Sequence, residues 1–80
     1  MPTVLRKGGF QVRIYTDDHV PMHVHVIQAD EEAVFYLGNE NEAPGIRENR
    51  SMKPVNLRRA LRLVAENQEL LIEKWREIHG

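Results

Sequence analysis

The chain has 80 residues, a formal net charge of −1 at pH 7 and no cysteine, which excludes disulfides and thiolate metal sites. A hydrophobic fraction of 41% and a charged fraction of 29% are those of an ordinary globular domain. No apolar run approaches the roughly 20 residues of a membrane span, and the first residues lack the apolar segment of a signal peptide. We therefore expect one small domain, residues 1–80, in a soluble cytoplasmic protein.

Two β-prone runs open the chain. The first spans about residues 3–6, and the Gly8-Gly9 pair that follows it tolerates the positive φ of a tight hairpin turn. Residues 10–16 alternate between apolar and polar with period two, which predicts a second strand. The alternation places three residues on each face: Phe10, Val12 and Ile14 on one, and Gln11, Arg13 and Tyr15 on the other.

A turn-forming segment then leads to the most distinctive run of the chain, His23-Val24-His25-Val26. Alternation predicts a strand at 23–28, with the two valines on one face and the two histidines on the other. A further turn precedes a fourth strand at about residues 33–37. Because short turns join consecutive strands, we expect an antiparallel meander.

The second half of the chain predicts a loop and one helix. Residues 38–53 are polar and irregular, and so long a connection in a small domain is usually functional, partner-bound or disordered. Pro54 suits the first turn of a helix, because its missing N–H costs nothing there. A helix over about residues 54–79 follows from apolar residues that recur at spacings of three, four or seven: Leu57, Leu61, Val64, Leu71, Trp75 and Ile78.

These elements predict an α+β fold, a four-stranded antiparallel meander (ββββα) with one long C-terminal helix packed on one sheet face. The apolar stripe of the helix would either form the core or associate with a second copy in a homodimer. The covered sheet face would hold Phe10, Val12, Ile14, Val24 and Val26. The opposite face would stay open and would gather Arg13, Tyr15, His23, His25 and Tyr36.

The histidine run is compatible with a metal site. Two imidazoles at i and i+2 of a strand lie on one face, and a third ligand from the preceding turn would complete a site for a divalent metal such as zinc. Such a site would use His19, His23 and His25, with Asp17 or Asp18 as alternatives to His19.

Two other interpretations need no cofactor. In the first, His23 and His25 act as acid and base beside Arg13 and Tyr15, in ribonuclease-type cleavage of a phosphodiester. In the second, the histidines are structural and hydrogen-bond to Tyr15 or to the carboxylates of the turn. Whether the protein is an enzyme therefore stays open.

Basic residues cluster in the second half of the chain. Such a cluster favours contact with nucleic acid or an acidic protein, or it is a solvated helix face that pairs with the acids between residues 30 and 48. The residues that would bind RNA or a partner are Arg50, Lys53, Arg58, Arg59 and Arg62.

The order of motifs along nearly the whole chain resembles a family of small bacterial proteins, domain-of-unknown-function family 4160. Met22 stands where this family usually has a second proline, the 38–53 loop is longer than usual, and Lys53-Pro54 replaces a Ser-Pro helix start. The motifs that carry the resemblance are Gly8-Gly9-Phe10, Ile14-Tyr15, Asp18-His19 before Pro21, His23-Val24-His25-Val26, Glu32-Ala33, Leu61-Arg62-Leu63-Val64, Asn67, Glu69-Leu70-Leu71 and Trp75.

The resemblance implies a function class, although no activity is established for the family. Its members are often encoded beside another small protein, in an arrangement similar to a toxin–antitoxin pair. We therefore expect a toxin–antitoxin-like module that binds a small protein partner or RNA. The alternatives are a metal-binding protein and a structural homodimer.

Overall fold

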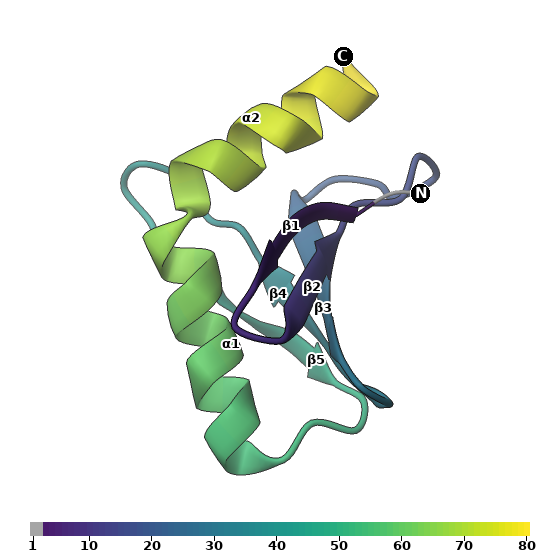
Figure 1. Ribbon diagram of the computed structural model, residues 1–80. Helices are drawn as coiled ribbons and strands as arrows, with labels where there is room; N and C mark the ends of the chain where they lie inside the picture. The colour runs from purple at the N-terminus through teal and green to yellow at the C-terminus, as the bar shows by residue number, and fades with distance from the viewer. Residues whose placement is uncertain (1–2) are drawn as a thin grey trace.

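A computed structural model describes residues 3–80 of the chain. It contains five strands followed by two helices (Figure 1). The α+β class and the antiparallel sheet are confirmed, but the prediction of four strands and one helix is wrong. The elements are β1 (Thr3–Lys7), β2 (Phe10–Arg13), β3 (His23–Gln28), β4 (Glu31–Tyr36), β5 (Gly45–Asn49), α1 (Pro54–Glu66) and α2 (Gln68–His79).

The five strands form one meander in the order β1-β2-β3-β4-β5, and every neighbouring pair is antiparallel. Gly8 and Gly9, with φ of 60° and 86°, make the turn between β1 and β2. Strand β2 ends at Arg13 and not at residue 16, because the chain turns where the Tyr15 N–H donates to the Asp18 carboxylate. This early turn brings the connection between β2 and β3 back over the sheet.

Strand β5 lies inside the segment predicted as a loop, residues 38–53. It pairs with β4 through the register Val34↔Glu48 and Phe35↔Ile46, with a bulge between the two pairs. Four of its five residues are exposed, as expected for an edge strand. An edge strand that buries neither face carries no apolar alternation, and so the sequence pattern did not show it.

The predicted single helix over residues 54–79 is divided at Asn67. The Asn67 side chain donates to the Leu63 carbonyl at 2.8 Å, and its backbone N–H lies 3.2 Å from the carbonyls of Leu63 and Val64. These bonds end α1 locally, and α2 begins at the next residue. Consequently α1 packs along the sheet against β4 and β5, while α2 turns across one end of it (Figure 1).

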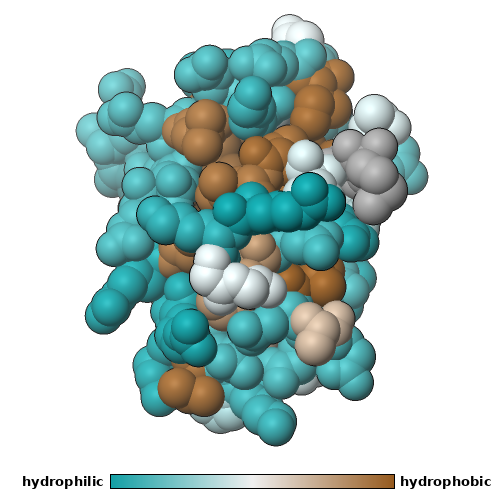
Figure 2. Space-filling model, in the orientation of Figure 1, coloured by the Kyte–Doolittle hydropathy of each residue, from teal (hydrophilic) through white to brown (hydrophobic). Residues whose placement is uncertain are grey.

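The core lies between the sheet and the helices. All five residues expected on the covered face are buried, and the helices add further apolar side chains. On the face shown in Figure 2, some apolar side chains also reach the surface below α2. The helical core residues are Ala60, Leu63, Val64, Leu71 and Trp75.

The opposite sheet face is covered over its two histidines, contrary to the prediction, whereas Tyr36, the register partner of His23, is exposed as expected. His23 and His25 are only 4% and 8% exposed. The connection from β2 covers them on one side, and Trp75 of α2 lies against His23. Among residues 3–80, neither helix has the length and apolar character required to cross a membrane.

Gly38 follows β4 at a φ of +68°, and a Cβ there would collide with the Glu42 carbonyl and lie 2.9 Å from the Ala43 carbonyl. We expect Gly38→Ala to lower the free energy of unfolding by about 2–4 kcal/mol, since backbone strain and overpacking add. Urea denaturation measures this loss. Gly45→Ala is the control, because its Cβ would meet nothing within 4 Å. Equal effects of the two substitutions would contradict the expectation.

Candidate metal centre

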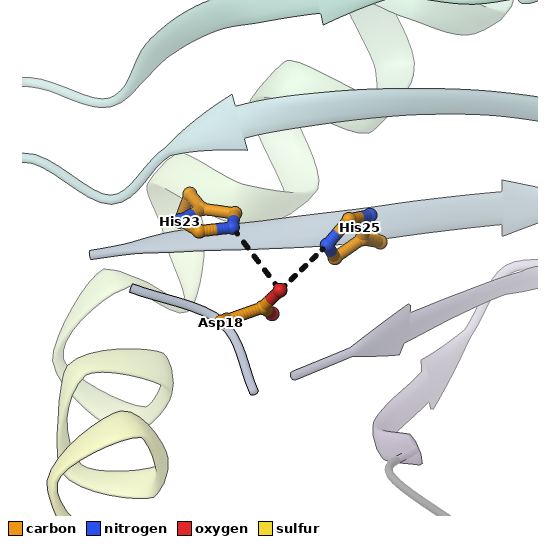
Figure 3. Close-up of side chains that lie close together, drawn as sticks. All are labelled: Asp18, His23 and His25. Atoms are coloured by element: carbon orange, nitrogen blue, oxygen red, sulfur yellow. Dashed lines mark hydrogen bonds and ion pairs between the residues drawn. The ribbon is translucent and has the colours of Figure 1, made fainter. Parts of the chain in front are cut away.

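The site is centred on one carboxylate oxygen. Asp18 Oδ1 lies 3.4 Å from Nε2 of His23 and 3.4 Å from Nε2 of His25 (Figure 3). All three ligand atoms lie within 4.8 Å of one another. The two histidines come from alternate positions of β3, which puts both imidazoles on the same face of the sheet.

The turn after β2 positions Asp18. The Tyr15 N–H donates to Asp18 Oδ2 at 2.9 Å, and the Asp18 N–H donates back to the Tyr15 carbonyl at 3.1 Å. The second carboxylate oxygen, Oδ1, is thereby left to face the histidines. The Tyr15 ring packs edge-on against His25 with centroids 4.8 Å apart.

The outer nitrogen of each imidazole has its own partner. His23 Nδ1 lies 2.9 Å from the Pro21 carbonyl, which can only accept, so Nδ1 carries the hydrogen. His25 Nδ1 lies 3.4 Å from Glu32 Oε2, and Arg50 holds that same oxygen at 3.0 Å. The contacts of the two Nδ1 atoms therefore fix the orientation of both rings, and both Nε2 atoms point toward Asp18.

Electrostatics keep Asp18 charged. Burial pushes the pKa of Asp18 upward, but the Tyr15 hydrogen bond and the positive charges that His25 and His23 carry when protonated outweigh it. The net result is a pKa below the ordinary value of 3.8. A charged carboxylate beside two imidazoles is a ligand set that suits divalent transition metals such as zinc.

Both contacts of Asp18 Oδ1 are longer than an ordinary charge-assisted hydrogen bond. In the neutral tautomer that donates from Nδ1, His23 Nε2 has a lone pair, and Asp18 Oδ1 is also an acceptor. A charge-assisted N–H···O bond would span about 2.7–2.9 Å, shorter than the 3.4 Å observed. Zinc bonds of about 2.0–2.1 Å at tetrahedral angles separate neighbouring ligands by about 3.3 Å. The two Asp18–histidine distances are close to such an edge, whereas the three ligand atoms together lie within 4.8 Å of one another.

Aromatic rings enclose one side of the site. The Trp75 ring lies 5.4 Å from the His23 ring, and His79 stacks on Trp75 at 4.0 Å. Because Trp75 is the only tryptophan of the chain, it stands as a natural fluorescent reporter beside the ligands.

The structure brings together part of the predicted acid–base group. His23, His25 and Tyr15 lie in one cluster. Arg13 is the register partner of His25, but its guanidinium donates to Gln11 at 2.9 Å. Its Nε is buried with no hydrogen-bond partner among residues 3–80.

The third side chain beside His23 and His25 is that of Asp18, one of the alternatives to His19 that the sequence allowed. His19 is exposed and lies outside the group of converging ligand atoms. Sequence reasoning did not assign Glu32 or Trp75 to the site. Ile27 follows His25 by two residues and so lies on the same face of β3. The register between β3 and β4 pairs Ile27 with Glu32, and this register would have placed Glu32 on the histidine face.

The predicted basic surface separates into two parts. Arg50 is engaged by Glu32 and Glu48, whose hydrogen bonds raise the pKa of Arg50, while Lys53 is exposed just before α1. Arg58, Arg59 and Arg62 lie on α1 and make no ion pair within residues 3–80. The Arg59 guanidinium lies 5.7 Å from the ring of Phe10.

Comparison with known proteins gives one match. The family described as Domain of unknown function (DUF4160) matches residues 9–76, which include β2 to β5, both helices but for the last residues, and all three candidate ligands. No curated protein and no solved structure matches the chain.

The lowered pKa of Asp18 predicts acid sensitivity of the metal-free protein. In the window between its folded value and 3.8, the unfolded state binds more protons, so stability is lost as the pH falls through that window. We expect Asp18→Asn to flatten this dependence in chelator, as measured by urea denaturation between about pH 2 and pH 5. Asp17→Asn, at an exposed neighbour, should retain the wild-type slope. A wild-type slope in Asp18→Asn would contradict the assignment.

Proposed function

The chain belongs to the DUF4160 family, and we propose that it is a metal-binding protein whose Asp18, His23 and His25 hold one divalent transition-metal ion. One observation carries the proposal: two imidazole Nε2 atoms converge on one carboxylate oxygen, while both Nδ1 atoms are engaged on the outside. Outer contacts to a carbonyl and a carboxylate are those that orient metal-binding histidines in proteins.

The ligand chemistry favours zinc. Two neutral imidazoles and one carboxylate suit zinc, and also iron, cobalt or nickel, whereas magnesium and calcium prefer an all-oxygen set. Two of the three distances between the candidate ligand atoms, 3.4 Å each, are close to the edge of a zinc tetrahedron, which supports zinc as the ion. Three protein ligands leave a fourth position for water, which is the arrangement of catalytic zinc sites.

The burial of the ligands limits what would reach the ion. The side chains of His23, His25 and Asp18 are 5%, 10% and 12% exposed. Such a site admits water or a small ligand more readily than a nucleic-acid strand. Ribonuclease-type acid–base chemistry therefore has less support, also because Arg13 is engaged by Gln11.

Purified protein should contain about one zinc ion per chain by elemental analysis. Zinc at 100 times its dissociation constant should stabilise the fold by about 2.7 kcal/mol. Copper or cobalt should quench Trp75 fluorescence, since that ring lies 5.4 Å from His23. Asp18→Ala and His25→Ala should remove all three effects.

The controls separate ligands from neighbours. His19→Ala should bind metal as the wild type does, because His19 is exposed and outside the cluster. Glu32→Gln should weaken binding about 10–100-fold, the usual cost of losing an outer partner. Metal-free protein that zinc neither stabilises nor changes in fluorescence would refute the proposal.

A second candidate is the toxin–antitoxin-like module that binds RNA or a protein partner. The observation that favours it is the face of α1 with Arg58, Arg59 and Arg62, which carries no ion pair within the described residues 3–80. Lys7 adds a further cation, because it pairs in register with Phe10, on whose ring Arg59 lies. Unneutralised arginines on one helix face suit a phosphate backbone.

A homodimer through the helix stripe is a third candidate with less support. The central members of the stripe, Val64, Leu71 and Trp75, are at most 4% exposed in the single chain. They already form the core, so the centre of the stripe is not available to a second copy, although Val55 and Leu70 of the helices are 54% and 37% exposed.

If the α1 arginines bind the phosphate groups of single-stranded RNA, the logarithm of the binding constant should fall linearly with the logarithm of the salt concentration. Arg58→Ala together with Arg59→Ala should reduce the slope by about 0.7 for each lost phosphate contact. Fluorescence anisotropy with a labelled oligonucleotide measures the slope, and Arg76→Ala on α2 is the control. RNA binding that this pair of changes leaves intact would exclude the α1 face as the binding surface.

A further inference from the structure

A groove of about 820 Å³ follows one flank of α2. It lies between that helix and the chain segments next to β3 and β4. It is separate from the metal centre, since none of the three candidate ligands lines it. Its lining residues are Met22, Asn39, Glu40, Gln68, Glu69, Ile72, Glu73, Arg76 and Glu77.

The groove is strongly acidic. Four glutamates line it against one arginine. Glu69, Glu73 and Glu77 follow one another at four-residue spacing on α2, so they form a ridge about 12 Å long. Within residues 3–80 only Glu77 of these three has an ion-pair partner, Lys74 at 3.7 Å. Like charges at i and i+4 destabilise an isolated helix, so the ridge costs stability that a bound cation would recover.

The groove also has an apolar base and a fixed wall. Met22 and Ile72 are half-buried side chains that pack against the core and line the groove. Gln68 Nε2 lies 2.8 Å from the Leu37 carbonyl and within 3.0 Å of two further carbonyls in the following turn, those of Asn39 and Glu42. These bonds tie the turn to the start of α2, so the groove exists before any partner arrives.

We propose that this groove binds a basic amphipathic helix of a partner protein. An apolar side chain of that helix would rest on Met22 and Ile72. Lysines or arginines at four-residue spacing would face Glu69, Glu73 and Glu77, since the same spacing repeats on both helices. The sign of the charge selects a protein and rejects a nucleic acid, and the interface is independent of both the metal centre and the α1 arginines.

The test uses the full chain and a synthetic peptide. The probe is a labelled helix-forming peptide of about 15 residues, with lysines at four-residue spacing beside a leucine stripe. Fluorescence anisotropy should show saturable binding that weakens with salt. Glu69→Lys together with Glu73→Lys should reduce affinity about tenfold or more. Glu66→Lys, at an exposed acid of α1 outside the groove, should leave affinity unchanged.

Thermal unfolding separates lost binding from lost folding. The double variant should melt close to the wild-type temperature, because Glu69 and Glu73 are exposed and make no ion pair within residues 3–80. A peptide of the same composition with scrambled lysine spacing should bind about tenfold more weakly. The affinity for the peptide should be the same in chelator and in zinc. A loss of peptide binding would therefore be distinguishable from a loss of metal binding.

Three outcomes would overturn the proposal. The first is equal affinity for the scrambled peptide, which would mean attraction by charge alone. The second is an equal loss of affinity in Glu66→Lys. The third is self-association of the chain at low salt. If the groove variant abolishes this self-association, and Arg58→Glu together with Arg59→Glu also abolishes it, the occupant of the groove is the basic helix α1 of a second copy.

Discussion

The two hydrogen bonds that Tyr15 and Asp18 exchange determine both the shape of the sheet face and the chemistry on it. They end β2 early and fold the connection to β3 back over the strands. The same bonds use one carboxylate oxygen and leave the other, Oδ1, 3.4 Å from two imidazole nitrogens. A covered sheet face and a converging ligand set are therefore two results of one tight turn.

Strand β3 links the core to the site because both of its faces are buried. Val24 and Val26 are fully buried among the apolar residues beneath the helices, and this packing fixes the strand's rotation and register. His23 and His25 must then point to the opposite side, where Asp18 meets them. Polar groups buried on that side need partners: each Nδ1 has one in Pro21 or Glu32, and both Nε2 atoms face Asp18 Oδ1. Any change that shifts β3 by one residue would exchange histidines for valines in the site.

The sequence predicted what periodicity encodes and missed what local side-chain geometry decides. Period-two alternation located the faces of β2 and β3, and the helical stripe located three of the residues that the helices bury, Val64, Leu71 and Trp75. Strand β5 lacked such a signal, because four of its five residues are exposed. The division at Asn67 depends on one side chain that bonds to a carbonyl four residues earlier, which a stripe of apolar residues does not reveal. The placement of Asp18, and not His19, beside the two histidines likewise depends on a turn whose shape no spacing rule determines.

The bend at Asn67 has an electrical consequence. Helix α1 carries three arginines against Glu66, and α2 carries three glutamates against Lys74 and Arg76. Because the helices point in different directions, the excess positive charge of α1 and the excess negative charge of α2 lie on different parts of a chain whose formal net charge is only −1. A molecule of this kind turns in the field of an approaching charged partner before contact. Its encounter rates should therefore depend on ionic strength far more than its net charge suggests.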